Sequence, residues 1–209
     1  MQRRQFLHSA LIGAGALLPG TGVAAMVTSS IPNSITGLIL PPLPASELTD
    51  LMTDLLIKDR FGVLKFLLGQ GVDVNAKNQS GETLLHAAAF YLSDVEIMQY
   101  LVSVGANVNV KDDYGRAPLY SAAYFNSVEA LQFLVSVGAE VNAKDNGGWT
   151  PLHRATESNS VEAMRFLVSV GADAAAKDDE GKMPLEVISE DDENAEEKKR
   201  ILREAVAKQ

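Results

Sequence analysis

The chain has 209 residues, a formal net charge of −9 and no cysteine. Nucleic acids and anionic membrane surfaces are poor partners for so acidic a chain, because both repel negative charge. No disulfide or thiolate chemistry is available, and the length suits one domain.

The first 25 residues have the layout of an export signal. Arg3 and Arg4 precede Phe6-Leu7, an apolar run over residues 11–18 and small residues at 23–25. The apolar run is shorter than the roughly 20 residues that span a membrane, so a cleaved signal peptide is expected. The Arg-Arg-x-Phe-Leu pattern resembles the twin-arginine signal, which implies export of a folded protein to the periplasm. Ordinary secretion and an uncleaved anchor are the alternatives.

Cleavage after Ala24 or after Ala25 fits the pattern equally well, and no stable membrane insertion is expected afterwards. Residues 1–25 contain two arginines and no acidic residue, so their removal takes the net charge from −9 to −11. Residues 26–44 carry Ser, Thr and Pro and are predicted to be a linker. A flexible tether is favoured there, and folding of residues 38–40 onto the first helix pair is the alternative.

The rest of the chain is built on a 33-residue period. The pentapeptide Val-Ser-Val-Gly-Ala occurs three times, with its glycine at positions 105, 138 and 171, and the glycines at 115, 148 and 181 keep the same step. A period of this length is typical of a solenoid of stacked units. We predict a domain over 45–209, made of an N-terminal cap (45–77), repeats at 78–111, 112–144 and 145–177, and a C-terminal cap (178–209).

Each unit is predicted to be a pair of helices. Thr150 can cap the first helix, and Pro151 suits its first turn. An apolar stripe beginning at Val161 predicts the second helix, which Gly171 ends in a left-handed conformation. In the N-terminal cap the corresponding helices are expected at 47–57, with Ser46 as N-cap, and at 61–68.

The C-terminal cap is predicted to start a helix at Met183-Pro184, as the other units do. The acidic run over 189–197 is expected to be a solvated loop and helix start, with a cation site or basic-partner site as the minority alternative. A final helix is expected over 198–207, with Ile201, Leu202 and Val206 facing the core.

The segment Gly148-Trp149-Thr150-Pro151-Leu152-His153-Arg154-Ala155, together with Gly171-Ala172-Asp173, resembles the ankyrin repeat, and the resemblance covers roughly residues 47–207. It implies an all-α ankyrin-repeat solenoid of stacked helix pairs joined by hairpin-like turns. Leu84 stands where that family has proline, and Tyr120 and Glu186 stand where it has histidine. These departures leave the expected fold unchanged.

No catalytic, metal or cofactor site is expected. His86 and His153 occupy the same place two units apart, roughly 20 Å from each other at a helix spacing of about 8–10 Å, so one metal ion could not join them. The resemblance implies instead that each imidazole bonds to backbone at the start of its helix. The periodic serines at 103, 136 and 169 have no neighbouring base that could activate them.

The positions of the aromatic residues predict the function. The resemblance implies that a partner meets the hairpin tips and the exposed end of each first helix, on the concave side. Those positions hold Phe90, Tyr91, Tyr114, Arg116, Tyr124, Phe125 and Trp149. Aromatic residues and arginine dominate the energetics of protein interfaces. We therefore expect a protein partner in an aromatic, acid-edged groove, with Tyr114, Tyr124, Phe125 and Trp149 as anchors.

The protein that carries this groove is expected to be a monomer. The alternative for Phe90 or Phe125 is a role in capping the core. Binding would serve to inhibit a toxic periplasmic enzyme, as an inhibitor or immunity protein does, or to assist an exported redox enzyme as an accessory factor.

Overall fold

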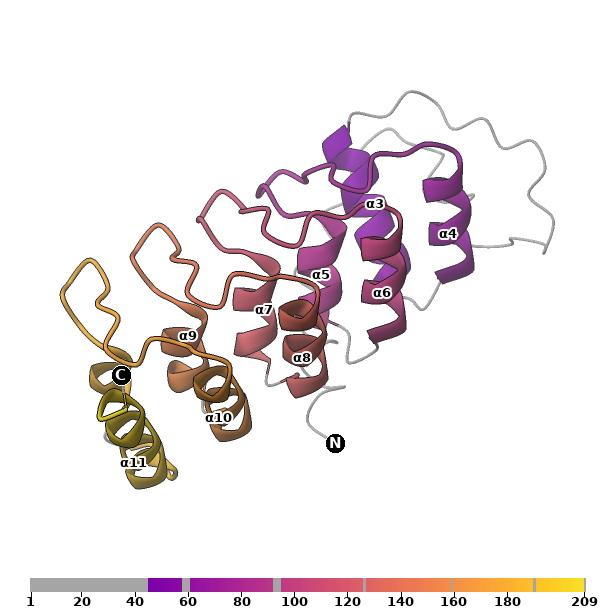
Figure 1. Ribbon diagram of the computed structural model, residues 1–209. Coiled ribbons are helices and arrows are strands. Elements are labelled where there is room, and N and C mark those ends of the chain that lie inside the picture. The colour runs from indigo at the N-terminus through magenta and orange to yellow at the C-terminus, as the bar shows by residue number, and fades with distance from the viewer. Residues whose placement is uncertain are drawn as a thin grey trace. The chain divides into compact units, whose positions relative to one another are not determined.

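The computed structural model describes residues 45–57, 61–91, 95–125, 127–158, 160–189 and 191–208. The predicted export signal and linker, residues 1–44, lie outside this range. Within it the regular structure is helical (Figure 1), and the elements are α3 (Ala45–Ile57), α4 (Phe61–Gly69), α5 (Leu84–Tyr91), α6 (Val95–Ser103), α7 (Pro118–Tyr124), α8 (Val128–Ser136), α9 (Pro151–Glu157), α10 (Val161–Ser169), the 3-10 helix η1 (Pro184–Val187) and α11 (Ala195–Val206). None of these described helices combines the length and the apolar character needed to cross a membrane.

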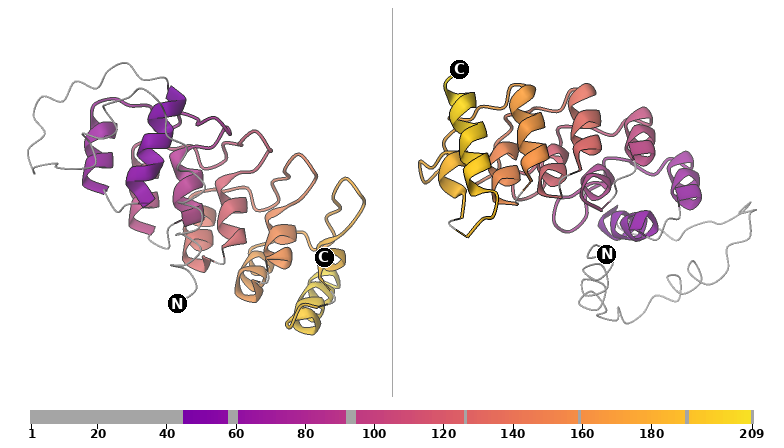
Figure 2. Two further views of the ribbon diagram at one scale, coloured as in Figure 1. Left: turned by 180° about the vertical axis from the view of Figure 1, so that it is seen from behind. Right: turned by 90° about the horizontal axis from the view of Figure 1, so that it is seen from below.

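The helices form two layers. The first helices of successive units, α3, α5, α7 and α9, contact one another in chain order, and the second helices α6, α8 and α10 do the same. The hairpin segments between units extend side by side (Figures 1 and 2). This arrangement confirms the predicted all-α solenoid of helix pairs.

The core is built from side chains that recur with the period. Leu85, Leu119 and Leu152 are buried at equivalent places in three successive units. Alanines at 88, 122 and 155 are also fully buried, and their small size lets neighbouring first helices approach closely. Each helix pair therefore covers the apolar face of the next, as a solenoid requires.

The predicted ends of the third repeat are confirmed. The hydroxyl of Thr150 accepts a hydrogen bond from the backbone N–H of His153 and caps α9, with Pro151 in the first turn. Gly171 has φ of +93°, as expected for a left-handed helix end. Gly115 has φ of +78°, and a Cβ there would lie 2.7 Å from the backbone nitrogen of Asn146 in the next unit. Glycine is therefore required at this close approach between hairpins.

Polar side chains also join each unit to the next. The amide nitrogen of Asn109 donates to the carbonyl of Gly138 at 3.0 Å, and its oxygen accepts from the N–H of Glu140 at 2.9 Å. Asn75 and Asn142 make the equivalent pairs of bonds. The ammonium groups of the lysines at 77, 111 and 144 each donate to the carbonyl of the lysine one unit further on, at 2.7 Å.

Two details of the caps differ from the prediction. Helix α3 begins at Ala45, so Ser46 lies inside the helix and is not its N-cap. The C-terminal cap begins with a 3-10 helix of four residues instead of an α-helix. There Met183 replaces the capping threonine, and the Glu186 carboxylate accepts from the Met183 N–H at 2.8 Å.

The last helix also differs in part. Helix α11 begins at Ala195, three residues before the predicted start. Ile201 and Leu202 are buried as predicted, but Val206 is 43% exposed and Ala205 is buried in its place. The fully buried side chain of Lys198, on the same helix, was not foreseen.

Candidate protein-binding surface

Four of the predicted binding residues form one cluster of rings at the ends of α5 and α7. The ring of Phe90 lies 4.2 Å from that of Phe125 and 4.6 Å from that of Tyr91, measured between centroids. Tyr124 lies 4.8 Å from Phe125 and 6.1 Å from Phe90. We call these four residues the aromatic cluster. Most of these contacts are edge-to-face, the geometry that aromatic pairs favour.

The aromatic cluster is exposed around a half-buried centre. Tyr91 is 45% exposed, Phe125 42% and Tyr124 38%, whereas Phe90 is half-buried among them. The repeat explains the placement, because residues 90 and 91 at the end of α5 correspond to Tyr124, the last residue of the adjacent α7, and to Phe125, its C-cap. The equivalent places at the end of α9 hold Glu157 and Ser158, so the aromatic surface ends there.

Arg154 closes the cluster on the α9 side. Its guanidinium carbon lies 3.9 Å from the centroid of the Tyr124 ring, within the range of a cation–π interaction. One nitrogen of the same guanidinium pairs with the carboxylate of Glu157. Its Nε is buried, with no hydrogen-bond partner in the described part of the chain. Sequence reasoning did not select Arg154, although it lies about one helical turn before Glu157, the position one period after Tyr124.

Tyr114 and Arg116 form a second group at a hairpin tip. Tyr114 is 61% exposed, and the Arg116 guanidinium carbon lies 4.6 Å from its ring centroid. Arg116 also bonds the buried carboxylate of Asp112 at 2.6 Å and lies 3.9 Å from a carboxylate oxygen of Glu82. The arginine is thus held in place, and Tyr114 is the more accessible member of the group.

Trp149 is held by contacts with neighbouring residues. Its indole N–H donates to the carboxylate of Asp178 at 3.1 Å, and its ring is half-buried beside that of His153, 5.8 Å between centroids. The tryptophan therefore ties the third repeat to the C-terminal cap. It keeps some exposed surface, but neither the aromatic cluster nor the tip group includes it.

Glu82 interacts electrostatically, through its carboxylate, with both the tip group (Tyr114 and Arg116) and the aromatic cluster. Its carboxylate faces Arg116 at 3.9 Å, and its negative charge also acts on the hydroxyl of Tyr91. Burial raises the pKa of Tyr91, and the charge of Glu82 adds to that rise. The negative charge of Glu82 therefore acts on both groups, although Glu82 precedes α5 and Tyr91 ends it.

Both histidines have the predicted structural role. The Nδ1 atom of His86 accepts the backbone N–H of Thr83 at 3.1 Å, and its Nε2–H donates to the carbonyl of Arg116 in the next unit at 2.9 Å. His153 makes the same two kinds of contact, each at 3.2 Å. Burial lowers the pKa of both imidazoles, which keeps them neutral near pH 7. The described residues contain no group of three or more acidic, histidine or cysteine side chains able to hold a metal.

In the middle repeat (112–144), a tyrosine replaces the histidine that bonds to the next unit in the other repeats. Ala117 stands where the other repeats have a capping threonine, and no side chain caps α7. Tyr120, in place of histidine, is hydrogen-bonded to the carboxylate of Asp145 in the following unit. Burial and the charge of Asp145 raise the pKa of the Tyr120 hydroxyl well above its usual range.

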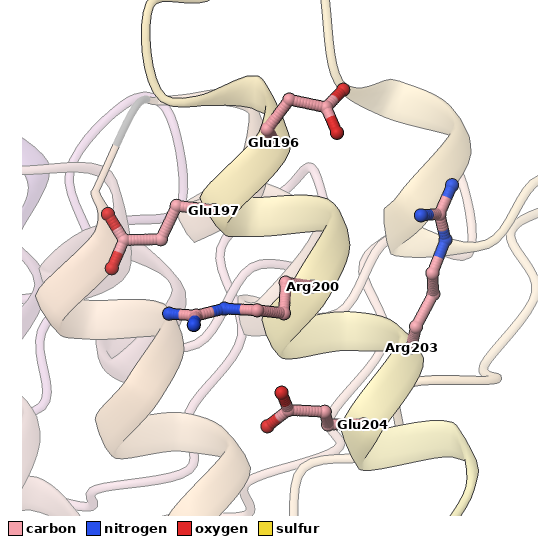
Figure 3. Close-up of a pocket in the computed structure, with 5 residues that line it drawn as sticks. All are labelled: Glu196, Glu197, Arg200, Arg203 and Glu204. Carbon is pink, nitrogen blue, oxygen red and sulfur yellow. The ribbon is translucent and has the colours of Figure 1, made fainter.

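An open depression of about 640 Å³ lies against α11, away from the rings. It is lined by Glu196, Glu197, Arg200, Arg203 and Glu204, which all come from one helix. Figure 3 shows that these side chains fan out in different directions instead of meeting at one point. Glu197 is also paired with Arg165 of α10. The depression is therefore a charged helix surface with no converging groups, and it is not a candidate ligand site.

Comparison with known proteins agrees with this geometry. The family described as "Ankyrin repeats (3 copies)" matches residues 55–145, and the family "Ankyrin repeat" matches residues 147–179. Among characterised proteins, the chain is 33% identical over 101 residues to the tyrosine-protein kinase Shark of Drosophila melanogaster, and 39% identical over 61 residues to the neurogenic locus Notch protein of the same organism. Those matches cover 46% and 29% of this chain, but only 11% and 2% of the relatives.

Helix pairs stacked at a fixed period, hairpin tips on one side and exposed rings at the first-helix ends define a repeat module for protein–protein interaction. The two family matches together cover more than half of the chain, which belongs to the ankyrin-repeat family.

Proposed function

We propose that this protein captures another protein on the aromatic cluster and performs no chemistry of its own. The observation that carries the proposal is the exposure of Tyr91, Tyr124 and Phe125 around Phe90. Burial of aromatic rings in an interface is energetically favourable, and large apolar residues exposed together at the surface mark interaction sites. Tyr114 and Arg116 extend the surface toward the hairpin tips, and Trp149 contributes at its margin.

The proposal is tested by capture of a partner with matched variants. The purified protein is immobilised, exposed to periplasmic extract and washed, and retained proteins are identified by mass spectrometry. The double variant Tyr124→Ala/Phe125→Ala is compared with Val104→Ala, which removes an apolar side chain of equal exposure (42%) from the end of α6. We expect the wild type and Val104→Ala to retain the same partner, and the double variant to retain at least tenfold less. Equal retention by all three proteins would contradict the proposal.

The proposed place of action is the periplasm, reached by twin-arginine export. The Arg3-Arg4 pair and the short apolar run support this, as does a repeat fold with local contacts, which folds quickly and so favours a route for folded cargo. Cell fractionation of the variant Arg3→Lys/Arg4→Lys tests it. We expect the variant to stay in the cytoplasm, and the wild type to have a mature N-terminus after Ala24 or Ala25. Unchanged export of the variant would exclude the twin-arginine route.

Assays with the captured partner distinguish two roles for this protein, inhibition and assistance. An inhibitor or immunity protein would lower the activity of a toxic periplasmic enzyme when the two are mixed. An accessory factor would leave activity in the mixture unchanged, but its deletion would reduce the amount of an exported redox enzyme.

A further inference from the structure

We infer that the segment which the partner places on the aromatic cluster is both apolar and basic, carrying lysine or arginine next to its apolar anchor. This inference rests on the proposed function and specifies the chemistry of the partner.

The face that surrounds the cluster has a large acidic excess. The four hairpin tips (78–82, 112–116, 145–149 and 178–182) and the first helices α3, α5, α7 and α9 together carry eleven acidic and three basic residues. The four lysines that directly precede the tips, at positions 77, 111, 144 and 177, reduce the excess but do not remove it. A partner that approaches this face meets a negative potential, which favours cations.

The three basic residues of the tips and first helices are already paired with acidic neighbours, and the lysines at 77, 111 and 144 donate to backbone carbonyls. Arg116 bonds Asp112, Arg154 bonds Glu157, and the Lys182 ammonium lies 2.7 Å from the Glu180 carboxylate. A carboxylate or phosphate of a partner would have to displace one of these internal pairs. An acidic partner is therefore disfavoured on the same grounds that favour a basic one.

Part of the acidic excess lies at the α3–α5 end of this face, where α3 carries three carboxylates and Glu82 lies just before the start of α5. Burial raises the pKa of Asp50, although a hydrogen bond with Asn78 opposes the rise, and the charges of Glu82 and Glu47 add to it. The charges of Glu82 and Glu47 thus both repel the carboxylate of Asp50, and Glu82 also acts on Tyr91. A cation placed here by a partner would relieve that repulsion.

The geometry limits how far apart the two features of the segment lie. Neighbouring first helices are about 8–10 Å apart, and an extended chain advances about 3.3 Å per residue. The rings lie at the C-terminal ends of α5 and α7, whereas Glu82 precedes α5, so the length of a first helix, about 12 Å for eight residues, adds to one or two helix spacings. A segment that lays an apolar side chain on Phe125 or Tyr124 therefore reaches the α3–α5 carboxylates with a basic residue about four to seven positions away. On the α9 side of the aromatic cluster, Arg154 and Glu157 are paired with each other, so a partner meets an internally balanced ion pair there.

A display library of random peptides about 12 residues long tests the inference with the full chain as bait. Three variants are compared with the wild type. Tyr124→Ala/Phe125→Ala removes two rings, and Glu47→Gln/Asp50→Asn removes two carboxylates of the inner face. Glu129→Gln/Glu162→Gln makes the same change of charge on the exposed second helices.

We expect peptides that depend on the two rings to combine an apolar residue with lysine or arginine about four to seven positions away. Their affinity should fall roughly three- to tenfold in Glu47→Gln/Asp50→Asn and stay within twofold in Glu129→Gln/Glu162→Gln. Ring-dependent peptides that are neutral or acidic would overturn the inference and leave the proposed function standing. Absence of any ring-dependent peptide would overturn both the inference and the proposed function. Concentration-dependent dimers of the full chain that are abolished by Tyr124→Ala/Phe125→Ala would also overturn both, because a second copy of the chain would then occupy the aromatic cluster.

Discussion

The ammonium group of Lys198 is fully buried and lies against the carboxylate of Asp192, six residues earlier in the C-terminal cap. It also donates to the carbonyl of Thr156 in α9 at 2.6 Å. Burial alone would raise the pKa of Asp192, but the hydrogen bonds from Lys198 and from the Asn194 N–H outweigh it, and the pKa is lowered. Lys198 thus links α11 to α9 of the third repeat.

Lys198→Met is expected to reduce the free energy of unfolding by about 3–5 kcal/mol, because it leaves a buried carboxylate and a carbonyl without their partner. Urea titration followed by circular dichroism measures the loss. Lys199→Met is the control, since Lys199 forms only an exposed pair with Glu196, and we expect a change within about 0.5 kcal/mol. Adding Asp192→Leu to Lys198→Met should recover part of the loss. Equal effects of the two lysine variants would contradict this account of the pair.

Stability should fall as the pH drops below about 6.5, the ordinary pKa of histidine. The pKa values of His86 and His153 are lowered in the folded state, so the unfolded chain binds more protons in the window between the ordinary and the lowered values. The contribution of each neutral imidazole is complete above about pH 6.5 and is lost progressively below it. Urea midpoints between pH 8 and pH 5 measure this.

The control for that pH dependence is His86→Gln/His153→Gln. This variant should be less stable at pH 8, because glutamine does not reproduce both ring contacts, and its midpoint should change less between pH 7 and pH 5.5. A wild-type midpoint that rises on acidification would show that the sign is wrong.

Ala117→Thr should raise the free energy of unfolding by about 0.5–2 kcal/mol. The backbone at Ala117 (φ −91°, ψ 164°) is nearly that of Thr150 (φ −94°, ψ 167°), so the new hydroxyl can accept from the N–H of Tyr120. Ala117→Val, which adds similar volume without a hydroxyl, is the control and should give no gain. A gain of the same size from valine would assign the effect to packing instead of capping.

Asn109→Ala should cost about 1–3 kcal/mol, because it removes two hydrogen bonds between units. Ala175 holds the equivalent place in the third repeat, and in the C-terminal cap that follows the position equivalent to Gly138 and Gly171 is Glu204 inside α11, so the carbonyl of a glycine turn is not offered there. Ala175→Asn should therefore change stability by less than about 0.5 kcal/mol. Thermal unfolding of the two variants tests both expectations. If Ala175→Asn were stabilising, asparagine at this position would act within its own hairpin and not through bonds to the next unit.

The periodic parts of the structure were predictable because one local solution is repeated. The Thr150 cap, the buried leucines and the left-handed Gly171 follow from spacing and residue type, since neighbouring repeats impose the same surroundings each time. The clustering of Phe90 with Tyr124 follows in the same way from their offset of one period plus one residue.

The caps were harder to predict because no neighbour repeats their surroundings. Lys198 belongs to a strongly charged stretch that resembles a solvated surface, and its burial depends on Thr156 of a different helix. Val206 matches the apolar spacing of α11, yet its side chain is exposed in the described part of the chain. The side-chain course of Arg154 over Tyr124 depends on rotamers that residue types alone do not specify.

The asparagine and lysine bridges have a direction. In the bridges made by the asparagines at 75, 109 and 142 and the lysines at 77, 111 and 144, the side chain belongs to the earlier unit and its partners are backbone groups of the unit that follows. Asn146 is an exception, because its amide donates back to the carbonyl of Asp113 in the preceding repeat. Protein synthesis proceeds in the same order, so each hairpin that emerges from the ribosome meets a neighbour whose donors and acceptors are already in position. Growth of the stack during translation can thus be templated from its N-terminal end, one unit at a time.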